Sequence, residues 1–245
     1  MKFRSFLFAV TALLWIALFQ NASLAHAEST ISCPSGEYDM LDWMTMDSDL
    51  RSSEYLTGSS NSIYTSIWPG KFWWTKSGLG YPWDIQLYDS NYIYLWITEL
   101  DWNNPQTFKK FANNTNMPLA PRCAKGGFPG STIIVPDTSY QTYTDCTHYI
   151  TQNLKTGVNQ VWGPYSLSFG GDIPSNVKTL VVSYRYNCDS NYRNCGDKEE
   201  YYLTQRFGLV QWIHYRLING SYQQQQKSVF NAIRKGVANP VFTCF

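Results

Sequence analysis

Six cysteines follow an N-terminal segment that has the features of an export signal. An even number of cysteines in an exported chain indicates disulfide bonds, because secretory and periplasmic compartments oxidise thiols. The chain is therefore expected to fold around cross-links that restrict how its strands and loops can be arranged. Proximity along the chain and parity predict three bonds, which are Cys188–Cys195, Cys123–Cys146 and Cys33–Cys244.

The export signal is predicted from three features of residues 1–27. Lys2 and Arg4 supply the positive start, and residues 6–19 form an apolar run that is shorter than the ~20 residues of a membrane-spanning helix. Residues 25–27 read Ala-His-Ala, a small-x-small cleavage pattern. We expect a signal peptide over residues 1–27 and a single β-rich domain over residues 28–245. The predicted location is secreted or periplasmic, without membrane insertion.

Charge and metal-ligand spacing exclude several classes of partner. Without Lys2 and Arg4, 17 basic residues face 18 acidic residues, and no cluster of Lys or Arg is present. Nucleic acid is therefore not an expected partner. A zinc site would need closely spaced cysteines or several histidines, but C-x₂-C pairs are absent and only His148 and His214 follow the signal segment. We expect no metal and no cofactor.

Alternation of apolar and polar residues with a period of two is the main secondary-structure signal. It predicts strands at residues 63–68, 71–76, 133–135, 165–169, 180–186, 199–205, 209–218 and 221–225. Asn219-Gly220 fits a type I′ hairpin turn. Helical spacing is confined to residues 39–50 and 229–235, and residues 103–130 are expected to be a long loop. The pattern predicts a mostly β protein, an antiparallel β-sandwich or jelly roll with one or two short helices.

The strongest indication of function is an aromatic strand at residues 92–102. In a strand, Ile93, Leu95 and Ile97 lie on one face and are the expected core residues. The opposite face would be a partly exposed platform for sugar rings, since aromatic faces stack on pyranose C–H groups. The predicted ligand-binding residues are Tyr92, Tyr94, Trp96, Trp102, Trp73 and Trp83. The alternative is that both faces are buried between two layers.

Three acidic residues are candidates for catalysis. Glu99 and Asp101 lie two residues apart, which in a strand separates their carboxyl groups by about 6–7 Å, within reach of the spacing in inverting glycosidases. Asp84 is a candidate partner from a facing element. The alternative interpretation is that acids at a strand end are simply solvated.

Two further features have structural alternatives. His214 lies on the Trp212 face of its strand, near Arg216. It is a candidate general base or a binding group for a carboxylate ligand, and the alternative is a half-buried, hydrogen-bonded structural histidine. Residues 189–200 have the outline of a calcium loop, but Arg193 and Asn194 depart from the pattern, so a metal-free acidic loop is expected.

These observations predict an exported protein that binds polysaccharide or glycan through exposed aromatic residues, without a recognisable catalytic motif. One alternative is a secreted glycan-cleaving enzyme, a hydrolase or a lyase, that uses an acidic pair. The other is a structural protein of the cell envelope.

Overall fold

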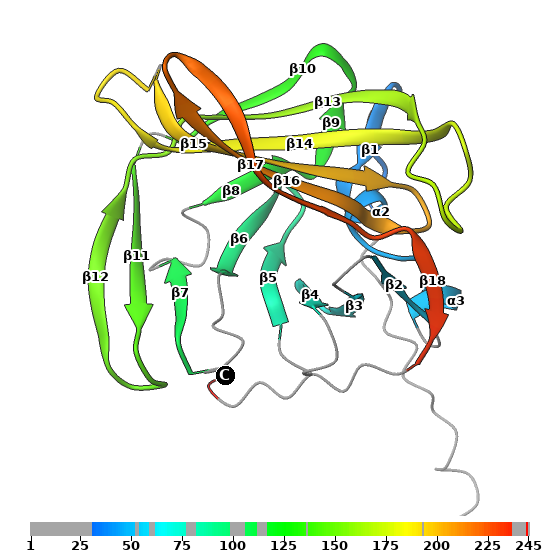
Figure 1. Ribbon diagram of the computed structural model, residues 1–245, viewed down its shortest axis with the longest axis horizontal. Coiled ribbons are helices and arrows are strands. Elements are labelled where there is room, and N and C mark those ends of the chain that lie inside the picture. The colour runs from blue at the N-terminus through cyan, green and yellow to red at the C-terminus, as the bar shows by residue number, and fades with distance from the viewer. Residues whose placement is uncertain are drawn as a thin grey trace, which may run out of the picture. The chain divides into compact units, whose positions relative to one another are not determined.

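The computed structural model contains two antiparallel sheets that face one another (Figure 1). It describes residues 31–51, 54–58, 62–76, 82–98, 106–111, 117–135, 137–192, 194–236 and 244. The six-stranded sheet has the order β10 (Gly127–Ile134), β13 (Val158–Leu167), β14 (Val177–Cys188), β15 (Cys195–Thr204), β16 (Gly208–Ile218) and β17 (Ser221–Val229). The predicted signal peptide lies outside the described residues.

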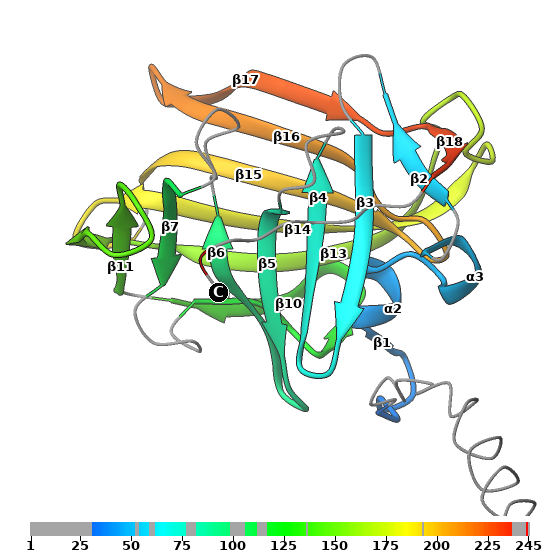
Figure 2. The same cartoon turned by 90° about the horizontal axis from the view of Figure 1, so that it is seen from below.

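The second sheet has ten strands, which cross those of the first sheet when viewed from below (Figure 2). Its order is β12 (Tyr149–Leu154), β11 (Thr138–Tyr143), β7 (Phe108–Phe111), β6 (Tyr92–Thr98), β5 (Pro82–Tyr88), β4 (Lys71–Lys76), β3 (Ser62–Trp68), β2 (Glu54–Thr57) and β18 (Ala232–Lys235), with β8 (Pro118–Pro121) also paired to β6. A separate two-stranded sheet joins β1 (Glu37–Asp39) to β9 (Cys123–Lys125). The prediction of a mostly β, antiparallel two-sheet fold is confirmed.

Two short helices follow β1. Helix α2 (Met40–Met44) begins after Asp39, whose carboxylate accepts a hydrogen bond from the Leu41 N–H at 3.0 Å and caps the helix. Helix α3 (Ser48–Arg51) follows a short break. The helix predicted over residues 39–50 is therefore two helices. Within the described part of the chain, no helix is both long and apolar enough to cross a membrane.

The helix predicted over residues 229–235 is wrong. Val229 ends β17, and β18 pairs antiparallel with β2, with Ile233 opposite Leu56. A short apolar run has no periodicity that separates helix from strand, so pairing with the edge of the ten-stranded sheet decides the outcome.

The loop predicted over residues 103–130 is also wrong for its described part. Strands β7, β8 and β9 and the start of β10 lie there. Pro118 and Pro121 bound β8, which pairs with the first residues of β6. Proline is tolerated at such strand ends, so its presence does not imply a loop.

The strand prediction is most accurate at β14–β17, which form a meander of consecutive antiparallel neighbours. Asn219 and Gly220 both have positive φ, 51° and 79°, and join β16 to β17 as the predicted type I′ turn. This meander carries most of the six-stranded sheet and places its alternate side chains toward the second sheet.

The main hydrophobic core lies between the two sheets and under α2. Leu56, Ile63, Phe72 and Trp74 reach it from the ten-stranded sheet. The facing sheet contributes Val182, Tyr184, Tyr201, Leu203 and Leu209, and α2 contributes Met40, Leu41, Trp43 and Met44. The Trp74 indole N–H donates to the carbonyl of Met44 at 3.0 Å, which ties the helix to the sheet.

All six cysteines form disulfides, but two predicted pairings are wrong. Cys188–Cys195 is confirmed, whereas the other bonds are Cys33–Cys123 and Cys146–Cys244, with Cα–Cα distances of 5.5 and 5.1 Å. Pairing of β1 with β9 carries the segment before β1 to Cys123, although the two cysteines are 90 residues apart. Strand pairing, rather than sequence proximity, selects the partners. Three disulfides indicate that the protein folds in an oxidising compartment.

Candidate functional site

Strand β6 is the described part of the predicted aromatic strand over residues 92–102, and it has one face in the main core. Ile93 and Leu95 are buried there, as predicted. On the opposite side, Tyr92 is 37% exposed, Trp96 is half-buried and Tyr94 is only 7% exposed. The expectation of an exposed ring at Tyr94 is therefore wrong.

Tyr94 is held by a local hydrogen-bond network. Its hydroxyl donates to Asp89 Oδ2 at 2.9 Å, while the N–H groups of Asn91 and Tyr92 donate to Oδ1 of the same carboxylate. Burial, together with the hydrogen bond to Asp89 and its charge, raises the pKa of Tyr94 to about 12. The Tyr94 hydroxyl therefore stabilises the turn between β5 and β6 through its hydrogen bond to Asp89.

A bulge in β6 explains a second departure from the prediction. Ile85 pairs with Ile97 while Gln86 pairs with Leu95, so Trp96 is the extra residue. Ile97 consequently leaves the core face and joins a smaller cluster with Ile85, Phe108 and Tyr143, against which Trp73, Trp96 and Cys244 pack. The predicted shared face of Ile93, Leu95 and Ile97 is wrong for Ile97.

The exposed aromatic surface lies on the outer face of β3–β6. Trp68 is 51% exposed and stacks on Trp73, with ring centroids 6.1 Å apart and an interplanar angle of 25°. The strand register places four residues in one line across β3, β4, β5 and β6. They are Trp68, Lys71, Leu87 and Tyr94, each paired with the next. We call Trp68, Trp73, Tyr92 and Tyr94 the outer aromatic row. Trp68 was not among the predicted residues, although its parity opposite to Ile63 and Ile67 indicates an outward side chain.

The remaining predicted residues divide into two groups. Glu99, Asp101 and Trp102, and the side chain of Trp83, lie outside the described residues, so their roles stay predictions. Asp84 is described and is 1% exposed. Its charge acts on Tyr184 and Tyr201 of the facing sheet, so it points away from the outer aromatic row.

A second candidate site lies on the face of β14–β16 that looks toward the ten-stranded sheet. The register aligns Tyr186 with Asp197 and Arg216 in one row, and Tyr184 with Glu199 and His214 in the next. A third row pairs Tyr201 with Trp212. We call this set the inner polar ladder; its members are Tyr184, Tyr186, Asp197, Glu199, Tyr201, Trp212, His214 and Arg216.

Glu199 is the central acceptor of the ladder. Its Oε1 accepts from the Tyr186 hydroxyl at 3.1 Å. Its Oε2 accepts from the Tyr201 hydroxyl at 3.2 Å and from the Trp212 indole N–H at 2.7 Å. These three donors fix the position of the Glu199 carboxylate.

Asp197 holds His214 in the adjacent row. Its Oδ1 lies 2.9 Å from His214 Nε2 and 3.7 Å from Arg216 Nε, and its Oδ2 accepts from Asn187 Nδ2 at 2.7 Å. The imidazole also stacks on Trp212, with centroids 6.3 Å apart. His214 is 18% exposed, which agrees with the half-buried, hydrogen-bonded alternative and leaves a basic role open.

The buried tyrosines of the ladder experience the same negative charges. Burial and then the charge of Glu199 raise the pKa of Tyr184 and of Tyr201 well above the ordinary value, and the charge of Asp84 acts in the same direction. Both phenols are therefore neutral donors. The charges of Asp84 from the ten-stranded sheet and Glu199 from the six-stranded sheet therefore act on the same two tyrosines. The sequence alone did not identify Glu199 as a site residue. The signal that was available is the alternation of Asp197 and Glu199 with Lys198 inside a strand flanked by tyrosines.

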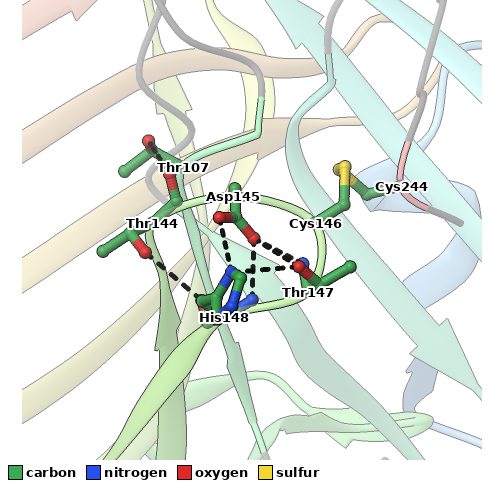
Figure 3. The surroundings of a disulfide bond; sticks show 7 residues. All are labelled: Thr107, Thr144, Asp145, Cys146, Thr147, His148 and Cys244. Carbon is green, nitrogen blue, oxygen red and sulfur yellow. Dashed lines mark hydrogen bonds and ion pairs between the residues drawn. A yellow bond between two sulfur atoms is a disulfide. The ribbon is translucent and has the colours of Figure 1, made fainter.

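The second histidine lies in the β11–β12 hairpin loop beside the Cys146–Cys244 bond (Figure 3). His148 Nδ1 is 2.8 Å from Asp145 Oδ2, and its side chain is 80% exposed. The Asp145 carboxylate also accepts from the N–H groups of Thr147 and His148, and these hydrogen bonds hold its pKa well below the usual range. These contacts of Asp145 therefore stabilise the conformation of the loop that contains Cys146.

No group of His, Cys, Asp and Glu among the described residues has an arrangement that could hold a metal ion. Comparison with known proteins finds no match to a protein family, to a curated protein or to a solved structure.

Proposed function

We propose that this protein is secreted or periplasmic and binds glycans through the outer aromatic row. The observation that carries the proposal is the exposed Trp68 ring, which is supported from behind by its stack on Trp73. An indole held in this way presents a flat apolar face without losing much side-chain freedom on binding.

The arrangement of the row suits an extended ligand. Trp68 and Tyr94 are three strand spacings apart, or about 14 Å, and Tyr92, which is 37% exposed, lies two residues from Tyr94 on the same strand. A chain of sugar rings lying across β3–β6 would contact Trp68 and Tyr92 together. The near-equal numbers of acidic and basic residues provide no overall field that would select a polymer by its net charge.

Replacing Trp68 with alanine is expected to weaken glycan binding by about 30-fold, since a central aromatic contact contributes about 2 kcal/mol. Stability should change little because the ring is half-exposed. Affinity electrophoresis or pulldown on a panel of insoluble and soluble polysaccharides measures the effect, and thermal unfolding checks the fold.

Phe128→Ala is the matched control, since Phe128 is also an exposed aromatic residue but belongs to β10 of the other sheet. Binding should survive this change. Equal weakening by both variants, or retention of wild-type affinity by Trp68→Ala, would exclude the outer aromatic row as the binding surface. Absence of binding to every polysaccharide would overturn the proposed function itself.

A further inference from the structure

We propose that the solvent-facing end of the inner polar ladder is a catalytic site that cleaves uronate-containing polysaccharides by β-elimination, with His214 as the base. This inference rests on the proposed function, because it takes the bound polymer to be a glycan. It uses a different surface, since the ladder belongs to the six-stranded sheet and faces away from the outer aromatic row.

His214 has the arrangement of an oriented base. Its Nε2 is fixed by Asp197, and Trp212 restrains the plane of the ring from one side. Within the described part of the chain, no residue forms a hydrogen bond with Nδ1, and the imidazole is accessible to solvent. A histidine that is held by a carboxylate through one nitrogen can take a proton with the other.

Arg216 supplies a site for the carboxylate of a uronate. It lies two residues beyond His214 on the same face of β16 and is 63% exposed. Its one polar contact among the described residues is Nε to Asp197 at 3.7 Å, which leaves the terminal nitrogens for bidentate pairing with a carboxylate. Arg216 would therefore place the carbon next to the bound carboxylate beside His214, and its charge would stabilise the negative charge that develops when that carbon loses its proton.

Tyr186 is the proton donor to the leaving oxygen. Its hydroxyl donates a hydrogen bond to Glu199, and His214 Nε2 is hydrogen-bonded to Asp197. The two side chains therefore reach β15 from the strands on its opposite sides, β14 and β16. Asp197 and Glu199 are two residues apart in that strand, which separates the two contact points by about 6–7 Å. In the contacts described, the two carboxylates act as acceptors, so they position Tyr186 and His214 and do not themselves deliver the proton.

The step balances without water or an oxidant. His214 takes the C5 proton of the uronate, the C5–H electrons form a C4=C5 double bond, and the C4–O glycosidic bond breaks. The Tyr186 O–H turns from Glu199, to which it donates in this structure, to the departing oxygen and gives that oxygen its proton. Transfer of the proton from His214 back to Tyr186 through solvent restores both groups. One polymer chain yields a shortened chain with a new hydroxyl end and a fragment with an unsaturated end.

To test this inference, the disulfide-bonded chain is incubated with polygalacturonate, alginate or glucuronan, and neutral xylan serves as the negative control. Ultraviolet absorbance of the unsaturated end and reducing-end release are measured together. His214→Gln is expected to lower the elimination rate by at least about 100-fold. His148→Gln is the matched control, because His148 also contacts an aspartate but lies in the exposed hairpin loop, and it should retain the wild-type rate.

Two further variants separate catalysis from folding. Arg216→Gln alters an exposed side chain, so the fold should persist while KM for the uronate polymer rises. Asp197→Asn keeps the shape of the positioning residue and should lower kcat with little change in KM, whereas a merely structural role would reduce only the folded fraction.

The outcomes are distinct. Unsaturated product that depends on His214 and Arg216 supports the inference. Reducing ends without ultraviolet absorbance would indicate hydrolysis and overturn it, as would an active His214→Gln or the absence of product from every uronate polymer. If binding still depends on Trp68 when no elimination occurs, the inference fails while the proposed function stands.

Discussion

Replacing Cys146 and Cys244 together by serine is expected to lower the free energy of unfolding by about 4.7 kcal/mol. The bond joins residues 98 apart in sequence, and a cross-link that closes so long a loop removes much conformational entropy from the unfolded chain. Cys244 also packs against the smaller hydrophobic cluster on the outer face. Urea unfolding followed by tryptophan fluorescence measures the loss, and Trp73 and Trp96 report on the cluster.

The Cys188–Cys195 bond provides the control within the same chain. It spans only seven residues, so the corresponding double serine variant should lose about 2.5 kcal/mol by the same chain-entropy relation. Both variants replace two sulfur atoms by oxygen, and the comparison therefore isolates loop length. A larger loss for the short loop than for the long one would contradict the entropic explanation.

Replacing Arg122 with methionine is expected to cost about 3–5 kcal/mol of stability. Arg122 is almost fully buried, and its guanidinium pairs with both oxygens of Asp39, with Nη2 at 2.8 Å from Oδ2. It also lies over the Tyr88 ring at 5.2 Å. Methionine keeps the apolar stem but leaves the Asp39 carboxylate largely buried without its cation, which is strongly destabilising. Denaturant titration monitored by circular dichroism gives the magnitude.

Two variants test whether the charge is responsible. Adding Asp39→Asn to Arg122→Met should recover part of the loss, because the uncompensated carboxylate is then gone. Arg206→Met removes an exposed ion pair with Asp49 at 3.4 Å and should cost less than about 1 kcal/mol. Similar losses at Arg122 and Arg206 would show that the buried pair contributes no more than a surface pair.

Local patterns predicted the strands of the meander because side chains alternate between the two faces of a strand. This alternation can be recognised within a segment of only a few residues. Strands β14 and β16 follow from alternation, and Asn219-Gly220 follows from the positive φ that a type I′ turn requires. The same logic was insufficient for residues 229–235, where β18 forms because the edge of β2 is available for pairing.

The candidate sites were only partly predictable for the same reason. Parity indicates that Trp68 points outward, but the stack on Trp73 depends on the pairing of β3 with β4. The bulge at Trp96 reverses the direction of Ile97, and the sequence of β6 contains no glycine or proline that would indicate it. Tyr94 is buried because it bonds Asp89 in the preceding turn.

Cysteine content, alternating hydrophobicity and turn residues were sufficient to derive an antiparallel, disulfide-bonded β protein, because each acts within a short stretch of chain. Strand order was needed to learn that Cys146 meets Cys244 and that Glu199 lies between Tyr186 and Trp212. These contacts join residues that are distant along the chain or aligned by register. Sheet pairing sets them, and a shift of one residue in register would send every side chain to the opposite face.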